Sequence, residues 1–182
     1  MKVSNWEKKA ANSPTNWHPT EGGRRAWICF EDDKTYDLGQ DPTGARFKKI
    51  SKMMLSGNYY PRDVIRLSGN FKTENREMQI GDRLFQKAPL LLRLGGPWLK
   101  SAVEIYVASQ TPNECEIGYV TTQMHHGRGI WNAILTHENN RLTLRVKSTA
   151  SPNSPLFWLG LPLARTMQLR ARRRAVEEFL KV

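Results

Sequence analysis

The sequence has only two cysteines, Cys29 and Cys115, and no apolar run of membrane-spanning length. Two cysteines are too few for a disulfide-stapled secreted scaffold, so we expect a reduced, cytoplasmic protein. The longest apolar stretches, in "APLLLRL" and "PLFWLGLPLA", fall short of the roughly 20 residues that a transmembrane helix needs, so we expect no membrane span. The first residues lack the apolar core of a signal peptide, so we expect no secretory leader.

Short motifs of several enzyme and metalloprotein classes are also missing. The sequence contains no Gly-x-Ser-x-Gly, no P-loop, no Gly-x-Gly-x-x-Gly, and no Cys-x-x-Cys or His-Glu-x-x-His spacing. The adjacent histidines His125 and His126 have no further ligand set beside them, and neighbours on a strand point to opposite faces. We therefore predict no metal site and no cofactor.

Positive charge is in excess, with 28 Lys and Arg residues against 17 Asp and Glu residues and a formal net charge of +11. Such a balance attracts polyanions. One interpretation is that the arginine-rich C-terminal segment binds nucleic acid or another polyanion through phosphate contacts. Its arginines are Arg170, Arg172, Arg173 and Arg174. The other interpretation is a solvated helix face balanced by Glu177 and Glu178, since no RNA-binding or zinc-finger signature is present.

Two helices are predicted from capping residues and apolar spacing. The first covers residues 42–56, because Asp41 is a good N-cap, Pro42 suits a first helical turn and Gly57 suits a C-terminal stop. The second begins at Pro162 and carries an apolar stripe at helical spacing. The residues of that stripe are Leu163, Ala164, Met167, Ala171, Ala175 and Phe179.

Most of the remaining chain alternates like strands. A first strand is expected at 25–30, ended by "EDDK", and closely spaced strands are expected at 64–69, 83–87, 90–98, 101–110, 115–123, 130–138 and 141–150. Consecutive strands without intervening helices exclude a doubly wound sheet. We predict an α+β fold in which a curved antiparallel sheet wraps around the long C-terminal helix and leaves a cavity between them. Residues 1–24 are predicted to be a poorly ordered arm, whose Trp6 and Trp17 are candidates for docking onto the body. Residues 25–182 are predicted to be a single domain.

The segment "GYVTTQMHHGRG" and the segments around it follow the order of motifs in a known family. "YDLGQDPTGARFKKISKMMLSGNYYP" is similar to that family's first helix, "KSTASPNSP" to its Ser-Arg-Pro-like stretch, and "GLPLARTMQLRARRRAVEEFL" to its terminal helix. Tyr119, Thr121, His125 and Gly129 match its central Tyr-Gly-Thr element and His-Pro-x-x-Gly-Glu-Glu turn. The chain thus resembles the family called domain of unknown function nineteen-ninety, known from bacteria and plants, over residues 36–181.

Three positions depart from that pattern. His126 stands where the family has proline, and Ile130 and Trp131 stand where it has two glutamates. Any role of those glutamates is therefore missing here. The resemblance implies a helix-grip fold like that of START-like and Bet v 1-like proteins, many of which hold an apolar or aromatic small molecule between helix and sheet. It does not specify a reaction.

Strand alternation selects a first group of candidate ligand contacts. Tyr119, Thr121 and Gln123 share one face of their strand, and Trp131 opens the next strand opposite Tyr119. Alternatively, Tyr119, Thr121 and Gln123 form a polar row that faces solvent. Arg145 alternates with apolar neighbours, so it would anchor a carboxylate if directed inward and be a surface charge if directed outward.

Tyrosines and histidine supply the second group. Tyr59 and Tyr60 leave the first predicted helix and suit either a cavity mouth or the edge of the core. His125 titrates near neutrality and, with Tyr119 and Tyr60, is a candidate acid or base. Alternatively, His125 is a structural histidine at the end of a strand, where it hydrogen-bonds to the backbone.

Three hypotheses of function follow. The first is a domain that binds a small apolar or aromatic molecule, with or without an acidic group, in the cavity. The second is a biosynthetic enzyme, a cyclase, isomerase or hydrolase, that uses the same cavity. The third is a nucleic-acid or polyanion binder that acts through the terminal helix.

Overall fold

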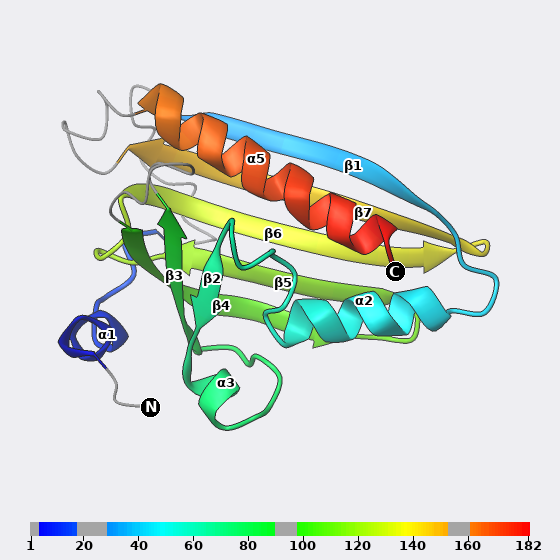
Figure 1. The fold of residues 1–182 in the computed structure, drawn as a ribbon, viewed down its shortest axis with the longest axis horizontal. Helices are drawn as coiled ribbons and strands as arrows, with labels where there is room; N and C mark the ends of the chain where they lie inside the picture. Colours follow the sequence, from blue (N-terminus) through cyan, green and yellow to red (C-terminus); the bar gives the residue numbers. More distant parts are fainter. Residues whose placement is uncertain (1–3, 18–28, 90–97, 153–160) are drawn as a thin grey trace.

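A seven-stranded antiparallel sheet forms the body of the protein in the computed structural model, which describes residues 4–17, 29–89, 98–152 and 161–182 (Figure 1). Its order is β1-β7-β6-β5-β4-β3-β2. The strands are β1 (Phe30–Gln40), β2 (Arg66–Ser68), β3 (Arg83–Pro89), β4 (Trp98–Gln110), β5 (Glu114–Thr121), β6 (Gly127–Glu138) and β7 (Arg141–Pro152). The helices are α1 (Asn5–Ala11), α2 (Ala45–Leu55), α3 (Asn70–Thr73) and α5 (Leu161–Leu180).

Helices α5 and α2 lie on the same face of the curved sheet (Figure 1). The predicted helix-grip architecture is therefore confirmed. None of the helices in the described part of the chain is long and apolar enough to cross a membrane.

Strand β1 differs from the predicted first strand. It runs unbroken through the acidic segment "EDDK", which the sequence analysis placed at a strand end. An edge strand tolerates charged side chains because one side has no strand partner. Alternation then separates the acids: Asp33 is exposed opposite Lys147, while Asp32 turns toward α5. The strands predicted at 25–30 and 90–98 lie largely outside the described residues.

Helix α2 follows the predicted signals with one shift. The buried Asp41 carboxylate accepts hydrogen bonds from the N–H groups of Phe47 at 2.8 Å and Arg46 at 3.3 Å. It therefore caps a helix that begins at Ala45 rather than at residue 42. Gly57 adopts a positive φ of 65° and donates its N–H to the Met54 carbonyl, as expected of a C-terminal stop.

The main core lies under the C-terminal half of α5. Val176 and Phe179 pack with buried residues of α2 and the sheet, among them Ile50, Ile117 and Leu135. The N-terminal half of α5 contributes less, and the predicted stripe residue Leu163 is 47% exposed. One end of the helix is therefore packed while the other end covers a hollow.

Residues 4–17 differ from the predicted loose arm. Ser4 and Glu7 form a capping box that starts α1, and Trp6 packs edge-on against Phe85 with ring centroids 5.9 Å apart. Asn16 donates its side-chain N–H to the Thr122 carbonyl at 2.8 Å. This part of the arm is thereby docked on the sheet, while the boundary proposed at residue 25 stays a prediction.

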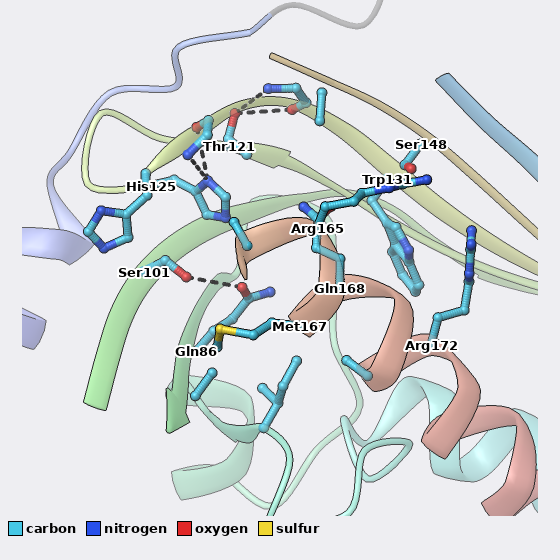
Figure 2. Close-up of a pocket in the computed structure, with 18 of the residues that line it drawn as sticks. Gln86, Ser101, Thr121, His125, Trp131, Ser148, Arg165, Met167, Gln168 and Arg172 are labelled. Carbon is cyan, nitrogen blue, oxygen red and sulfur yellow. Dashed lines mark hydrogen bonds between the residues drawn. The ribbon is translucent and has the colours of Figure 1, made fainter. Parts of the chain in front are cut away.

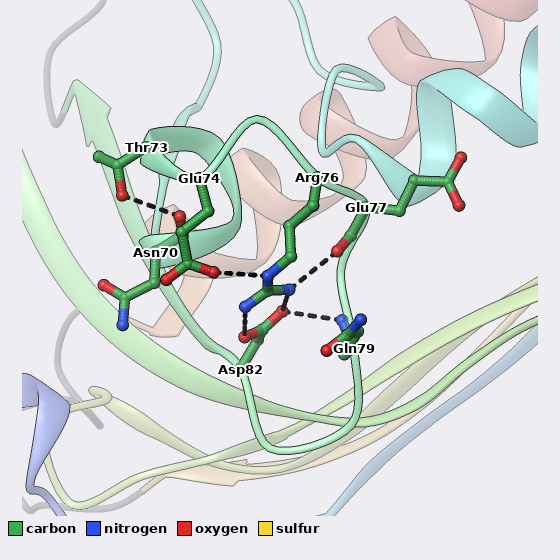
Figure 3. Close-up of polar contacts among 7 residues, drawn as sticks. All are labelled: Asn70, Thr73, Glu74, Arg76, Glu77, Gln79 and Asp82. Carbon is green, nitrogen blue, oxygen red and sulfur yellow. Dashed lines mark hydrogen bonds and ion pairs between the residues drawn. The ribbon is translucent and has the colours of Figure 1, made fainter.

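An arginine organises the loop that leads into β3 (Figure 3). The two Nη atoms of Arg76 each donate to an oxygen of Asp82 at 2.7 Å, and its Nε donates to Glu74 at 2.6 Å. Asp82 also accepts the Gln79 N–H at 2.8 Å. Its pKa is lowered, because these bonds outweigh the effect of burial. The loop is thus fixed by a bidentate ion pair.

Candidate functional site

A cavity of about 210 Å³ lies between the N-terminal half of α5 and the concave face of the sheet (Figure 2). Its lining is mainly apolar and comes from β1, β3, β4, β5, β6, β7 and α5. Gln86, Ser101 and His125 occupy one end, and Arg165 and Arg172 occupy the other (Figure 2). The cavity is thus apolar in its middle and polar at both ends.

Stacked aromatic rings form one wall. Tyr119 and Trp131 are cross-strand partners on β5 and β6, with ring centroids 5.1 Å apart and planes inclined by 17°. Tyr59 also stacks with Trp131, with ring centroids 6.1 Å apart, and contacts Tyr60 at 4.6 Å. Tyr60, Tyr119 and Trp131 line the cavity. Tyr59 is only 3% exposed and lines a smaller hollow beside it.

Burial keeps these phenols neutral. It raises the pKa of Tyr119 to about 12, which hydrogen bonding with Gln86 partly offsets. It also raises the pKa of Tyr59 and of Tyr60, although the charge of Arg172 acts in the opposite direction on Tyr60. The tyrosines can therefore donate a hydrogen bond at neutral pH but cannot serve as phenolate bases.

Thr121 lines the cavity, and its hydroxyl group is already hydrogen-bonded within the protein. Its Oγ1 accepts the Gly129 N–H at 2.8 Å and lies 2.5 Å from Asn16 Oδ1. The threonine side chain thus joins β5 to β6 and to the segment after α1. Its contribution to a ligand would come from its methyl group.

His125 also lines the cavity, at the turn between β5 and β6. Its Nδ1 lies 2.9 Å from both the backbone nitrogen and the carbonyl oxygen of Gly127, so the ring is bonded to the backbone of the turn. Burial lowers the pKa of His125 to about 4, so the imidazole is uncharged at neutral pH. His126 is exposed, with its Nε2 3.1 Å from the Lys100 carbonyl oxygen. Among the described residues, no three His, Cys, Asp or Glu side chains cluster as a metal site would require.

A carboxylate and two arginines form the charged end. Arg165 donates two hydrogen bonds to Asp32, at 2.5 and 2.6 Å, and Ser148 adds a longer one at 3.4 Å. Hydrogen bonds from Arg165 lower the pKa of Asp32 despite its partial burial. Nη1 of Arg172, one of the predicted polyanion contacts, lies 3.8 Å from the same carboxylate.

Two predicted ligand contacts are placed elsewhere. Gln123 lies beyond the end of β5, is exposed, and donates its N–H to the Pro14 carbonyl. The strand predicted to include Gln123 ends at Thr121, so Gln123 does not share a strand face with Tyr119 and Thr121. Arg145 points away from the cavity and pairs with Asp33 at 2.6 Å, both side chains being 49% exposed. Of the two orientations considered for Arg145, the structure shows the outward one, in which it is a surface charge.

The four arginines of the polyanion interpretation divide between two environments. Arg170 and Arg172 line the cavity. Arg174 pairs with Glu177 at 2.9 Å, and the exposed Arg173 lies 3.7 Å from the same glutamate. They do not form one exposed row along α5, which weakens the case for a phosphate-binding face.

Asp32 and Arg165 are cavity residues that the sequence analysis missed. The signal for Arg165 was its spacing: it precedes Arg172 by seven residues, so these two share one face of the helix, next to the predicted stripe residues Ala164 and Ala171. Asp32 carried no comparable signal, because the acidic segment around it was taken for a turn. Gln86, Ser101 and Gln168 also line the cavity without a sequence cue.

Comparison with protein families gives a match over residues 7–178 to the model described as a domain of unknown function, DUF1990. The chain belongs to this family. The resemblance in motif order is therefore confirmed. A search of curated proteins finds no match.

Solved structures share the fold of this DUF1990 protein at very low identity. A hypothetical protein from Helicobacter pylori aligns with a TM-score of 0.52 at 8% identity, covering 99% of this chain and 94% of that one. The KanY protein aligns with 0.53 at 8%, covering 85% and 97%. The di-domain ARO/CYC protein StfQ from the steffimycin biosynthetic pathway aligns with 0.51 at 8%, covering 85% of this chain and 50% of StfQ. At this identity the likeness establishes the fold alone.

Proposed function

We propose that this DUF1990 protein binds a small apolar or aromatic molecule in the cavity between α5 and the sheet. The observation that carries the proposal is the hollow itself, about 210 Å³ with a mainly apolar lining. An apolar cavity of roughly 150 Å³ can hold benzene, so this volume is large enough for a small organic molecule. A core filled by side chains would leave no such space.

Burial of apolar surface would supply most of the affinity. Each Å² of apolar surface removed from water contributes roughly 25 cal/mol, and the stacked wall of Tyr119 and Trp131 offers a flat partner for a ring. A few polar groups would fix the orientation, among them Gln86 and Ser101, whose side chains are joined by a hydrogen bond of 3.1 Å.

A neutral fluorescent probe, N-phenyl-1-naphthylamine, tests this proposal by titration. We expect saturable binding to the wild type and a loss of about tenfold or more in the variant Ala164→Phe, whose ring would occupy the cavity. Thr166→Phe adds a ring on the exposed side of the same helix and serves as the control. Equal affinity for the wild type and Ala164→Phe would contradict the proposal, as would no saturable binding to the wild type.

An enzyme that uses the same cavity is the second candidate function. The position of His125 in the cavity wall favours it, because a neutral imidazole there can accept a proton from a bound molecule. Its lowered pKa of about 4 makes it a weak base. Tyr119 and Tyr60 would act as hydrogen-bond donors beside it. Substitution of His125 by Gln, followed by assay for cyclase, isomerase or hydrolase turnover, tests this role. Unchanged turnover in that variant would exclude His125 as the acid or base.

A further inference from the structure

Arg172 is a largely buried arginine that has no close ion-pair partner in the described part of the chain. Its side chain is only 15% exposed, and the single ion pair it makes within the described residues is with Asp32 at 3.8 Å. That separation is too long for a hydrogen bond. A guanidinium stays charged at physiological pH, and its burial is costly unless an anion pairs with it. The side chain is therefore poised for an additional acceptor.

Asp32 does not satisfy this need, because Arg165 already occupies both of its oxygens. The Arg165–Asp32 pair has the two parallel hydrogen bonds of an ideal guanidinium–carboxylate contact. Asp32 thus neutralises Arg165 and leaves most of the charge of Arg172 uncompensated.

The charges of the side chains that line the cavity also favour an anionic ligand. Of the described residues, those in the cavity walls include a single acidic side chain, Asp32, and no lysine or glutamate. They include four arginines, which are Arg128, Arg165, Arg170 and Arg172. A cavity with this excess of positive charge favours an anionic ligand over a neutral or cationic one.

We infer that the ligand is an aromatic or apolar carboxylic acid whose carboxylate binds the guanidinium of Arg172. This inference rests on the proposed function of the cavity. Arg172 lies where an acid and a ring can be bound together, because it lines the same walls as Trp131 and Tyr60. Arg165, which is paired with Asp32, lies near Arg172 at the same end of the cavity (Figure 2). Arg172 thereby takes the role that the sequence analysis gave to Arg145.

A pair of probes of nearly equal shape separates the anchor from the apolar cavity. 2-Naphthoic acid carries the carboxylate, and 2-naphthalenemethanol replaces it with a neutral group. Calorimetric titration at pH 7 gives the affinity of each for the wild type, Arg172→Gln, Arg172→Lys and Arg141→Gln. Arg141 is 57% exposed on the sheet, so its loss removes the same charge away from the cavity.

We expect the wild type and Arg141→Gln to prefer the acid by about tenfold or more, the effect of one charged hydrogen-bonded pair. Arg172→Gln should lose that preference and still bind the alcohol, which also shows that the variant is folded. Arg172→Lys should retain part of it, because a lysine supplies charge without the fork geometry.

Two results would overturn the inference while leaving the cavity intact. One is equal binding of acid and alcohol by the wild type, and the other is a preference for the acid that persists in Arg172→Gln. Failure of both probes to bind the wild type would instead refute the proposed function and the inference with it.

Discussion

Arg165 on α5 donates two hydrogen bonds, of 2.5 and 2.6 Å, to Asp32 on β1. The two residues are 133 positions apart in the sequence, and their contact joins the N-terminal half of the terminal helix to the edge of the sheet. At this end of the helix few large side chains are buried, so the ion pair replaces apolar packing as the link between the two layers.

Asp32→Asn should therefore destabilise the protein at pH 7 by about 1–2 kcal/mol, since both partners are partly screened by solvent. The folded-state pKa of Asp32 lies below its ordinary value of 3.8, so the pair's contribution is complete above that pH and declines as the pH falls below it. Thermal unfolding from pH 7 to pH 3 measures the effect. The difference in stability between wild type and variant should narrow toward the acid end.

Asp33→Asn is the matched control for that experiment. It removes the neighbouring carboxylate, whose partner Arg145 is exposed on the opposite face of the sheet. A smaller change is expected at every pH, because exposed ion pairs contribute little. A loss in Asp33→Asn as large as that in Asp32→Asn would contradict the account of α5.

His125 should make the stability of the protein fall between about pH 6.5 and pH 4. Its folded-state pKa of about 4 lies below the ordinary value of 6.5, so the unfolded chain binds a proton first as the pH drops. With 1.36 kcal/mol for each pKa unit, the loss is on the order of 2–3 kcal/mol after allowance for partial exposure. Urea unfolding of His125→Gln should show a flatter pH dependence in this window.

His126→Gln provides the comparison, because His126 is exposed beside it. Its pH profile should follow that of the wild type. A His125→Gln profile as steep as the wild type's would show that the imidazole is not buried in its neutral form.

Gly129 should not tolerate a side chain. A Cβ placed there would lie 2.0 Å from the Thr149 carbonyl oxygen and 2.8 Å from the Ala150 Cα. Both obstacles are backbone, so β6 and β7 would have to separate. We expect Gly129→Ala to lower the free energy of unfolding by at least 1–3 kcal/mol, the range for overpacked sites.

Gly127→Ala, two residues earlier, is its control. The nearest atoms to a Cβ at Gly127 lie 3.5 Å away, in ordinary contact distance. Chemical denaturation of the two variants should therefore separate them clearly. Equal stability of both would contradict the strand pairing at this turn.

The architecture was accessible from the sequence because its signals are local. Alternation gave the run of antiparallel strands, and the cap at Asp41 and the stop at Gly57 gave α2 nearly to its ends. The acidic segment of β1 was misread, because charge suits a turn and an edge strand equally well. Only the long-range pairing with β7 decides between them.

The cavity was predictable in part. Cross-strand register follows from a short turn, so Tyr119 and Trp131 could be paired from the sequence. The charged end of the cavity could not be predicted from the sequence. Asp32, Arg165 and Arg172 come together only once β1 and α5 are placed in three dimensions. The inward or outward direction of Arg145 likewise depended on its partner Asp33, which lies 112 positions away.

The most direct test of the central claim is an NMR map of where 2-naphthoic acid binds. The cavity account predicts intermolecular NOEs from the naphthyl protons to the Trp131 ring and to the methyl groups of Ala164 and Ala171, all of which line the hollow. NOEs confined to residues outside the cavity, or their absence at saturating acid, would contradict it.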